Sequence, residues 1–68
     1  MNYIYEYRGV KVVAHEPLDD SDISYYVGRA VAVSYIYPAI IRVDYINNEA
    51  VLQIIYEHPS RTIKVRRP

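Results

Sequence analysis

Apolar and polar residues alternate along the first stretch of the chain, residues 2–7, which is the period of a β-strand. Arg8-Gly9 follows as a two-residue turn, because glycine readily takes the positive φ that tight hairpin turns require. Residues 10–14 then resume the strand pattern, and pairing Tyr7 with Val10 sets Glu6 opposite Lys11. The predicted hairpin has one apolar face, made of Tyr3, Tyr5, Tyr7, Val10, Val12 and Ala14.

A second hairpin is predicted for residues 39–56, with Asn47-Asn48 as its turn, because asparagine tolerates the left-handed conformation. With Ile46 opposite Glu49 one face is entirely apolar, and a slip of one residue would turn it to water. The opposite face is half aliphatic, and its aliphatic residues are Ile40, Ile46, Val51 and Ile55. After His58-Pro59-Ser60, residues 61–65 read as a short edge strand.

Two interpretations are open for the middle of the chain, residues 19–37. A helix is favoured by the acidic residues and serine at its start, which cap helices, and by an apolar stripe at helical spacing. The stripe consists of Ile23, Tyr26, Val27, Ala30, Val31 and Ser34. A third hairpin is favoured by the many β-branched and aromatic residues and by Gly28-Arg29 as a turn.

The helical interpretation predicts one α+β domain over residues 1–68, with the order β-β-α-β-β-β and the helix packed on one face of the sheet. This order resembles the β-grasp arrangement of ubiquitin-like domains and of small immunoglobulin-binding bacterial domains. The resemblance lies in the order of elements, so it implies a fold and no function. The hairpin interpretation predicts a small all-β barrel instead.

Composition narrows the class of protein. The chain has 68 residues, no cysteine, a hydrophobic fraction of 51% and eight basic residues against eight acidic ones. These values predict a soluble, cytoplasmic globular protein with no membrane span and no disulfides. All nine aromatic residues are tyrosines, and we expect their rings at the margins of the core, with the hydroxyls reaching water or backbone.

No motif for catalysis, nucleotide binding or metal binding stands out. The two glycines, Gly9 and Gly28, belong to no phosphate-binding loop. A metal site formed by His15-Glu16 and Glu57-His58 is conceivable, but these spacings match no standard motif. We therefore expect no enzymatic activity, no catalytic residue, no metal and no cofactor.

The leading hypothesis is a small non-enzymatic protein-interaction or regulatory protein, a class that includes virus-encoded accessory proteins. A single helix can cover only one side of the sheet. The side chains of the half-aliphatic face must therefore face water, a protein partner or a second copy of the chain. A homodimer would supply the burial that so short a chain lacks. The predicted contact residues are Ile40, Ile46, Val51 and Ile55.

The alternative hypothesis is a nucleic-acid-binding protein. Its basic residues would come from the C-terminal strand and its end, helped by Arg8, Arg29 and exposed tyrosines on which bases stack. A net charge of zero disfavours it, and basic side chains on an edge strand also protect against aggregation. The candidate residues are Arg61, Lys64, Arg66 and Arg67.

Overall fold

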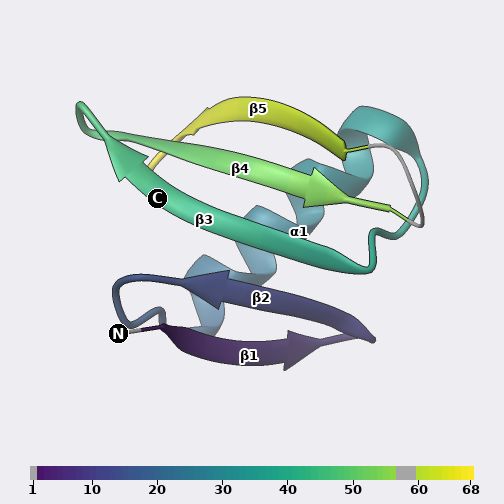
Figure 1. Cartoon of the computed structure of the whole chain (residues 1–68), viewed down its shortest axis with the longest axis horizontal. Coiled ribbons are helices and arrows are strands. Elements are labelled where there is room, and N and C mark those ends of the chain that lie inside the picture. Colours follow the sequence, from purple (N-terminus) through teal and green to yellow (C-terminus); the bar gives the residue numbers. More distant parts are fainter. Residues whose placement is uncertain (1, 57–59) are drawn as a thin grey trace.

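The computed structural model describes residues 2–56 and 60–68, and within them every side chain except that of Ser34. One helix and five strands follow in the predicted order (Figure 1). The metal ligands considered at Glu57 and His58 lie outside the described residues. The elements are β1 (Tyr3–Tyr7), β2 (Val10–Ala14), α1 (Asp20–Ser34), β3 (Ile40–Ile46), β4 (Glu49–Ile55) and β5 (Ser60–Arg66).

Both predicted hairpins form in the predicted register. In the first, Tyr7 pairs with Val10 and Glu6 lies opposite Lys11. In the second, Ile46 pairs with Glu49. All four turn residues have positive φ, between 52° and 80°, which is the left-handed conformation that two-residue hairpin turns need.

The middle segment is a helix, so the all-β barrel is wrong. Asp19 caps α1: its carboxylate accepts a hydrogen bond from the amide of Asp22 at 2.9 Å, and the Asp22 carboxylate accepts one from the Asp19 amide at 3.3 Å. This reciprocal capping box satisfies two of the amides that the first turn of a helix leaves without partners. The helix ends at Ser34, where Tyr35 takes a left-handed conformation (φ 61°) and its amide donates to the carbonyl of Val31.

The strands lie across the sheet in chain order, β1-β2-β3-β4-β5. Every neighbouring pair is antiparallel except β2 and β3, which run parallel because α1 connects them as a crossover. The first and last strands therefore form the two opposite edges of the sheet (Figure 1). The chain shares the order of its elements along the sequence with the β-grasp arrangement. Its sheet is open and mixed, and the fold class is α+β.

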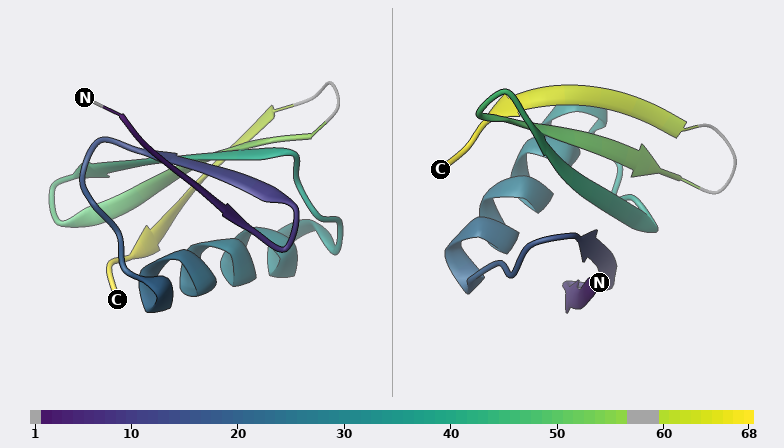
Figure 2. Two further views of the ribbon diagram at one scale, coloured as in Figure 1. Left: turned by 90° about the horizontal axis from the view of Figure 1, so that it is seen from below. Right: turned by 60° about the vertical axis from the view of Figure 1, so that its left-hand side comes forward.

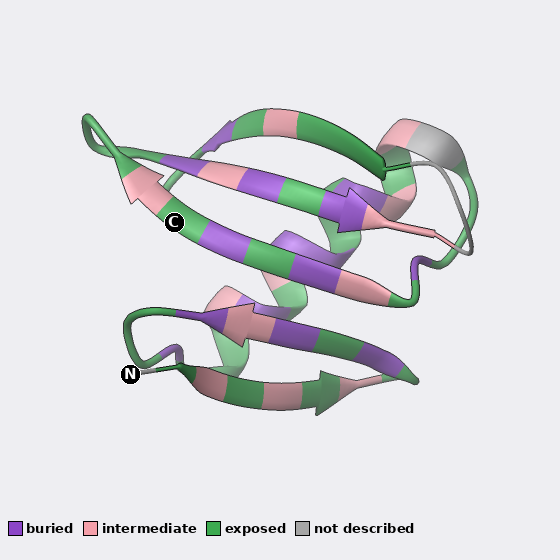
Figure 3. Cartoon of the chain, viewed as in Figure 1, coloured by how far each residue is buried: buried purple, intermediate pink, exposed green. Residues whose placement is uncertain are grey.

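The core lies between α1 and one face of the sheet. Figure 2 shows the helix crossing below the strands, with no second layer above them. Burial alternates along β2, β3 and β4, as a sheet with one covered face requires (Figure 3). The predicted stripe of α1 is buried at four positions, Ile23, Tyr26, Val27 and Ala30.

Candidate protein-interaction surface

The face of the sheet that points away from α1 is here called the open face. Alternation along the strands decides which side chains lie on it, because directly opposed residues in neighbouring strands share a face. It carries the four predicted contact residues and two further aliphatic residues, Ile4 and Val13, which are opposed across the first hairpin. The six aliphatic residues are Ile4, Val13, Ile40, Ile46, Val51 and Ile55.

The predicted contact residues lie on this face as two separate pairs. Ile40 and Ile55 are directly opposed and both half-buried. Ile46 and Val51 are diagonal neighbours toward the other end of the same two strands, and Ile46 is 54% exposed. The pairs are separated by polar residues, of which Arg42 opposes Gln53. The aliphatic residues of this face therefore do not form one continuous patch.

A polar hollow occupies the space between these pairs. Its volume is about 150 Å³, and its lining includes Arg42, Asp44 and Gln53 of the second hairpin. Beside β2, His15 places its Nε2 atom 3.2 Å from a carboxylate oxygen of Asp44. The parallel pairing of β2 with β3 brings these two side chains together, so sequence spacing alone gave no sign of the contact.

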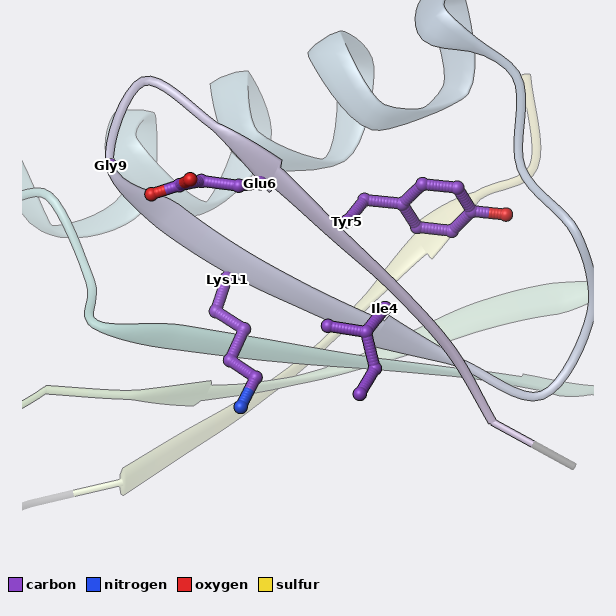
Figure 4. A pocket seen from close by; sticks show the side chains of 5 residues that line it. All are labelled: Ile4, Tyr5, Glu6, Gly9 and Lys11. Carbon is purple, nitrogen blue, oxygen red and sulfur yellow. The ribbon is translucent and has the colours of Figure 1, made fainter.

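A second hollow, of about 380 Å³, lies at the first hairpin (Figure 4). Ile4, Glu6 and Lys11 line it from the open face, and Ile4 is 61% exposed. The alternation of residues 2–7 had placed Ile4 and Glu6 on this face, so the signal for this end of the surface was present in the sequence. The sequence does not show that Ile4 and Glu6 share a surface with the second hairpin, because it does not give the order of the strands in the sheet.

Charges of both signs surround the aliphatic pairs. Arg66 of β5 opposes Glu49 of β4, and Lys64 opposes Val51. The open face carries the acids Glu6, Asp44 and Glu49 and the bases Lys11, Arg42, Lys64 and Arg66. A surface with this mixture can be complementary to a second copy of itself.

The four basic residues of the alternative hypothesis do not form one patch. Lys64 and Arg66 lie on the open face, whereas Arg61 opposes the buried Ile54 and so points to the helix side. Arg67 also lies on the helix side, where its guanidinium is 3.8 Å from the centre of the Tyr45 ring and 3.8 Å from a Glu16 carboxylate oxygen. The structure thus brings these residues together only in part.

Within the described residues, no group of three or more histidine, aspartate or glutamate side chains is placed to hold a metal ion. No helix in that part of the chain is long and apolar enough to cross a membrane. The chain matches no protein family model, and comparison with curated proteins and with solved structures finds no match either.

Proposed function

We propose that this chain is a non-enzymatic protein-interaction or regulatory protein that acts as a homodimer joined through the open face. The observation that carries the proposal is that α1 covers one face of the sheet (Figure 2), while six aliphatic residues lie on the other. Ile4 and Ile46 are 61% and 54% exposed and the other four are half-buried, so a partner on this face would remove apolar surface from water. The mixture of charges on the same face favours a second copy as the partner.

Size supports the same proposal. A chain of 68 residues buries only about 60% of the surface that its unfolded form exposes, and a partner subunit is one way to add burial. Fully burying an exposed isoleucine side chain contributes about 1.5–3 kcal/mol, and a half-buried one contributes less. A two-fold interface contains each residue twice, so the more exposed Ile4 and Ile46 would contribute most to dimer stability.

Nucleic-acid binding is supported less well. Phosphate contacts require several basic side chains on one surface, and here Arg61 and Arg67 lie on the other side of the sheet from Lys64 and Arg66. The side chain of Arg67 is also engaged by Tyr45 and Glu16.

Size-exclusion chromatography with light scattering tests the proposal. We expect the natural chain to be a dimer at low and high salt, without copurifying nucleic acid, and Ile55→Lys to be a monomer, because the lysines would bring charge into an apolar contact. Ala32→Lys is the matched control, since Ala32 is exposed on α1 and far from the open face in the fold. It should remain a dimer.

Ile46→Lys provides a second variant in case Ile55→Lys does not fold, because Ile46 is the more exposed of the two side chains. Two results would contradict the proposal: a natural chain that is monomeric at micromolar concentration, or folded lysine variants that both remain dimeric. Absorbance that reveals nucleic acid bound only at low salt would favour the nucleic-acid alternative.

A further inference from the structure

A groove lies on the helix side of the molecule, between the β1–β2 turn and the C-terminal half of α1. Figure 2 shows this turn beside the helix, and a contact of 3.4 Å between the hydroxyls of Tyr7 and Ser24 joins the two. The groove has a volume of about 290 Å³, close to the lower limit of typical ligand pockets. Its walls are Tyr7, Arg8 and Tyr37, and its floor is Ser24, Gly28 and valines of α1. We call it the Arg8 groove.

The charge in this groove is positive. Arg8 occupies the first turn position, where its φ of 52° is part of the tight turn. Its guanidinium lies 5.5 Å from the centre of the Tyr7 ring, and its hydrogen bond to Tyr37 raises the pKa of Arg8. Arg8 is exposed, and none of the described residues that line the groove carries a carboxylate. An acidic ligand would therefore meet an accessible cation without a competing acid.

Gly28 gives the groove part of its space. A glycine inside a helix is less stable than alanine by about 0.8–1 kcal/mol. Packing does not require it here, because a Cβ atom at Gly28 would meet no heavy atom within 4 Å beyond its chain neighbours and the backbone of its own helix. Backbone conformation does not require it either, since Gly9 alone among the described glycines has a positive φ. A ligand that approaches the helix backbone closely would explain the glycine.

The loop that follows α1 contributes Tyr37 to the groove and carries further exposed apolar side chains. Tyr35, Ile36 and Tyr37 are 89%, 61% and 52% exposed. Tyrosine and arginine are enriched among the residues that contribute most to binding at protein interfaces. The ligand that suits this surface thus combines an acidic group with a large apolar one.

We propose that the Arg8 groove binds a partner peptide that presents an aspartate or glutamate beside a large aliphatic or aromatic side chain. The carboxylate would accept hydrogen bonds from Arg8, and the apolar side chain would lie against Tyr37 and the helix at Gly28. A single arginine matches one carboxylate better than it matches the many phosphates of a nucleic-acid strand. The groove and the open face lie on opposite sides of the sheet, so this inference does not depend on the dimer.

Two capped probe peptides test the proposal: acetyl-Glu-Leu-Phe-Glu-amide and its glutamine counterpart, acetyl-Gln-Leu-Phe-Gln-amide. We expect the acidic peptide to shift the backbone amide signals of Arg8, Ser24 and Gly28 in NMR titrations. Arg8 is exposed and its ion pair is screened by water, so the neutral peptide should bind up to about fivefold more weakly. Equal binding of the two peptides, or shifts confined to other residues, would overturn the proposal.

Two variants locate the site. Arg8→Gln should weaken binding of the acidic peptide up to about fivefold, whereas Arg29→Gln, on an exposed helix position outside the groove lining, should not change it. Gly28→Leu should fill the groove and abolish binding while leaving the protein at least as stable, because leucine is the better helix former. Loss of binding together with unchanged or higher thermal stability cannot result from misfolding.

A stable Gly28→Leu protein with unchanged affinity would rule out this groove. The same amides shifting more strongly with an oligothymidine, in a salt-dependent way, would assign the groove to nucleic acid and would also overturn the proposal. The monomeric Ile55→Lys variant should bind the acidic peptide as the natural chain does. Failure of the groove and failure of the dimer are therefore distinguishable.

Discussion

Several tyrosines of this protein have hydrogen-bond partners for their hydroxyls, and one of these tyrosines lies deep in the core. Tyr26 is fully buried, and its hydroxyl donates a hydrogen bond of 2.9 Å to the hydroxyl of Tyr45. The hydroxyl of Tyr5 accepts a hydrogen bond of 2.9 Å from the backbone amide of Leu18. Tyrosine can replace phenylalanine in this core because such partners remove the cost of burying the hydroxyl.

Alkaline pH should destabilise the fold through Tyr26. Burial raises the pKa of Tyr26 above its ordinary value, and the hydrogen bond to Tyr45 raises it further. The unfolded chain therefore releases the proton of Tyr26 at lower pH than the folded chain does. The contribution of protonated Tyr26 to the free energy of unfolding is lost as pH rises above about 10. Tyr26→Phe should lower stability at neutral pH by about 0.5–1.5 kcal/mol, because Tyr45 loses its partner, but it should reduce the alkaline loss.

Urea unfolding at neutral pH and near pH 11 measures both effects. Tyr35→Phe is the control, since the Tyr35 side chain is exposed and should contribute to neither effect. If Tyr26→Phe lost as much stability at alkaline pH as the natural chain does, ionisation of Tyr26 would not be the cause.

The sequence allowed the position of most tyrosines to be predicted, but not the hydroxyl partner of Tyr26. Tyr3, Tyr5 and Tyr7 are half-buried at the margin of the core, as the alternation of the first strand indicated. The helical stripe placed Tyr26 on the packed face of α1, but its partner, Tyr45, belongs to β3 and is distant in the sequence. A pattern read along the chain cannot show such a partner.

At the scale of the elements, local signals were sufficient wherever contacts are local. Alternation and the two-residue turns determined both hairpin registers, since any slip would have exposed the apolar face. The middle segment was ambiguous because its residues favour strands while its ends favour a helix. The capping box at Asp19 and the packing of the apolar stripe on the sheet outweigh the strand propensity of residues such as Val27 and Val31.

The cap of α1 should make stability depend on acid pH. Hydrogen bonds from the Asp22 amide and the Ser21 hydroxyl lower the pKa of the Asp19 carboxyl. A lowered pKa in the fold means that the cap stabilises the protein above the ordinary pKa of aspartate and is lost as pH falls through the lowered one. Asp19→Asn should keep most of the cap and flatten this part of the acid dependence, because asparagine accepts the same hydrogen bond without titrating.

Asp19→Ala should lower the thermal midpoint at neutral pH, since alanine accepts no hydrogen bond from the Asp22 amide. Thermal unfolding followed by circular dichroism between neutral and acid pH compares the three proteins. An Asn variant with the same acid dependence as the natural chain would show that other carboxylates dominate it.

At the scale of the whole molecule, the surfaces proposed for binding depend on contacts between distant segments. The groove combines residues of β1, the following turn, α1 and the loop before β3. The open face joins its two hairpins only through the pairing of β2 with β3. Sequence patterns assigned each residue to a face, but did not identify its neighbours on that face.

A dimer through the open face would leave two Arg8 grooves accessible. One partner with two acidic segments would then bind both grooves and gain avidity.

The chain order of the strands also has a consequence for how fast the protein folds. Each hairpin can form from neighbouring residues, whereas joining β2 to β3 first requires closure of the segment 15–39, which has a larger entropic cost. We expect this closure to limit the folding rate. Val43→Ala, at the joint opposite Ala14, should then mainly slow folding, and Val65→Ala, on the edge strand β5, should mainly accelerate unfolding. Stopped-flow measurements in urea give the folding and unfolding rates separately. If Val65→Ala mainly slowed folding and Val43→Ala mainly accelerated unfolding, the sheet would assemble from its C-terminal edge instead.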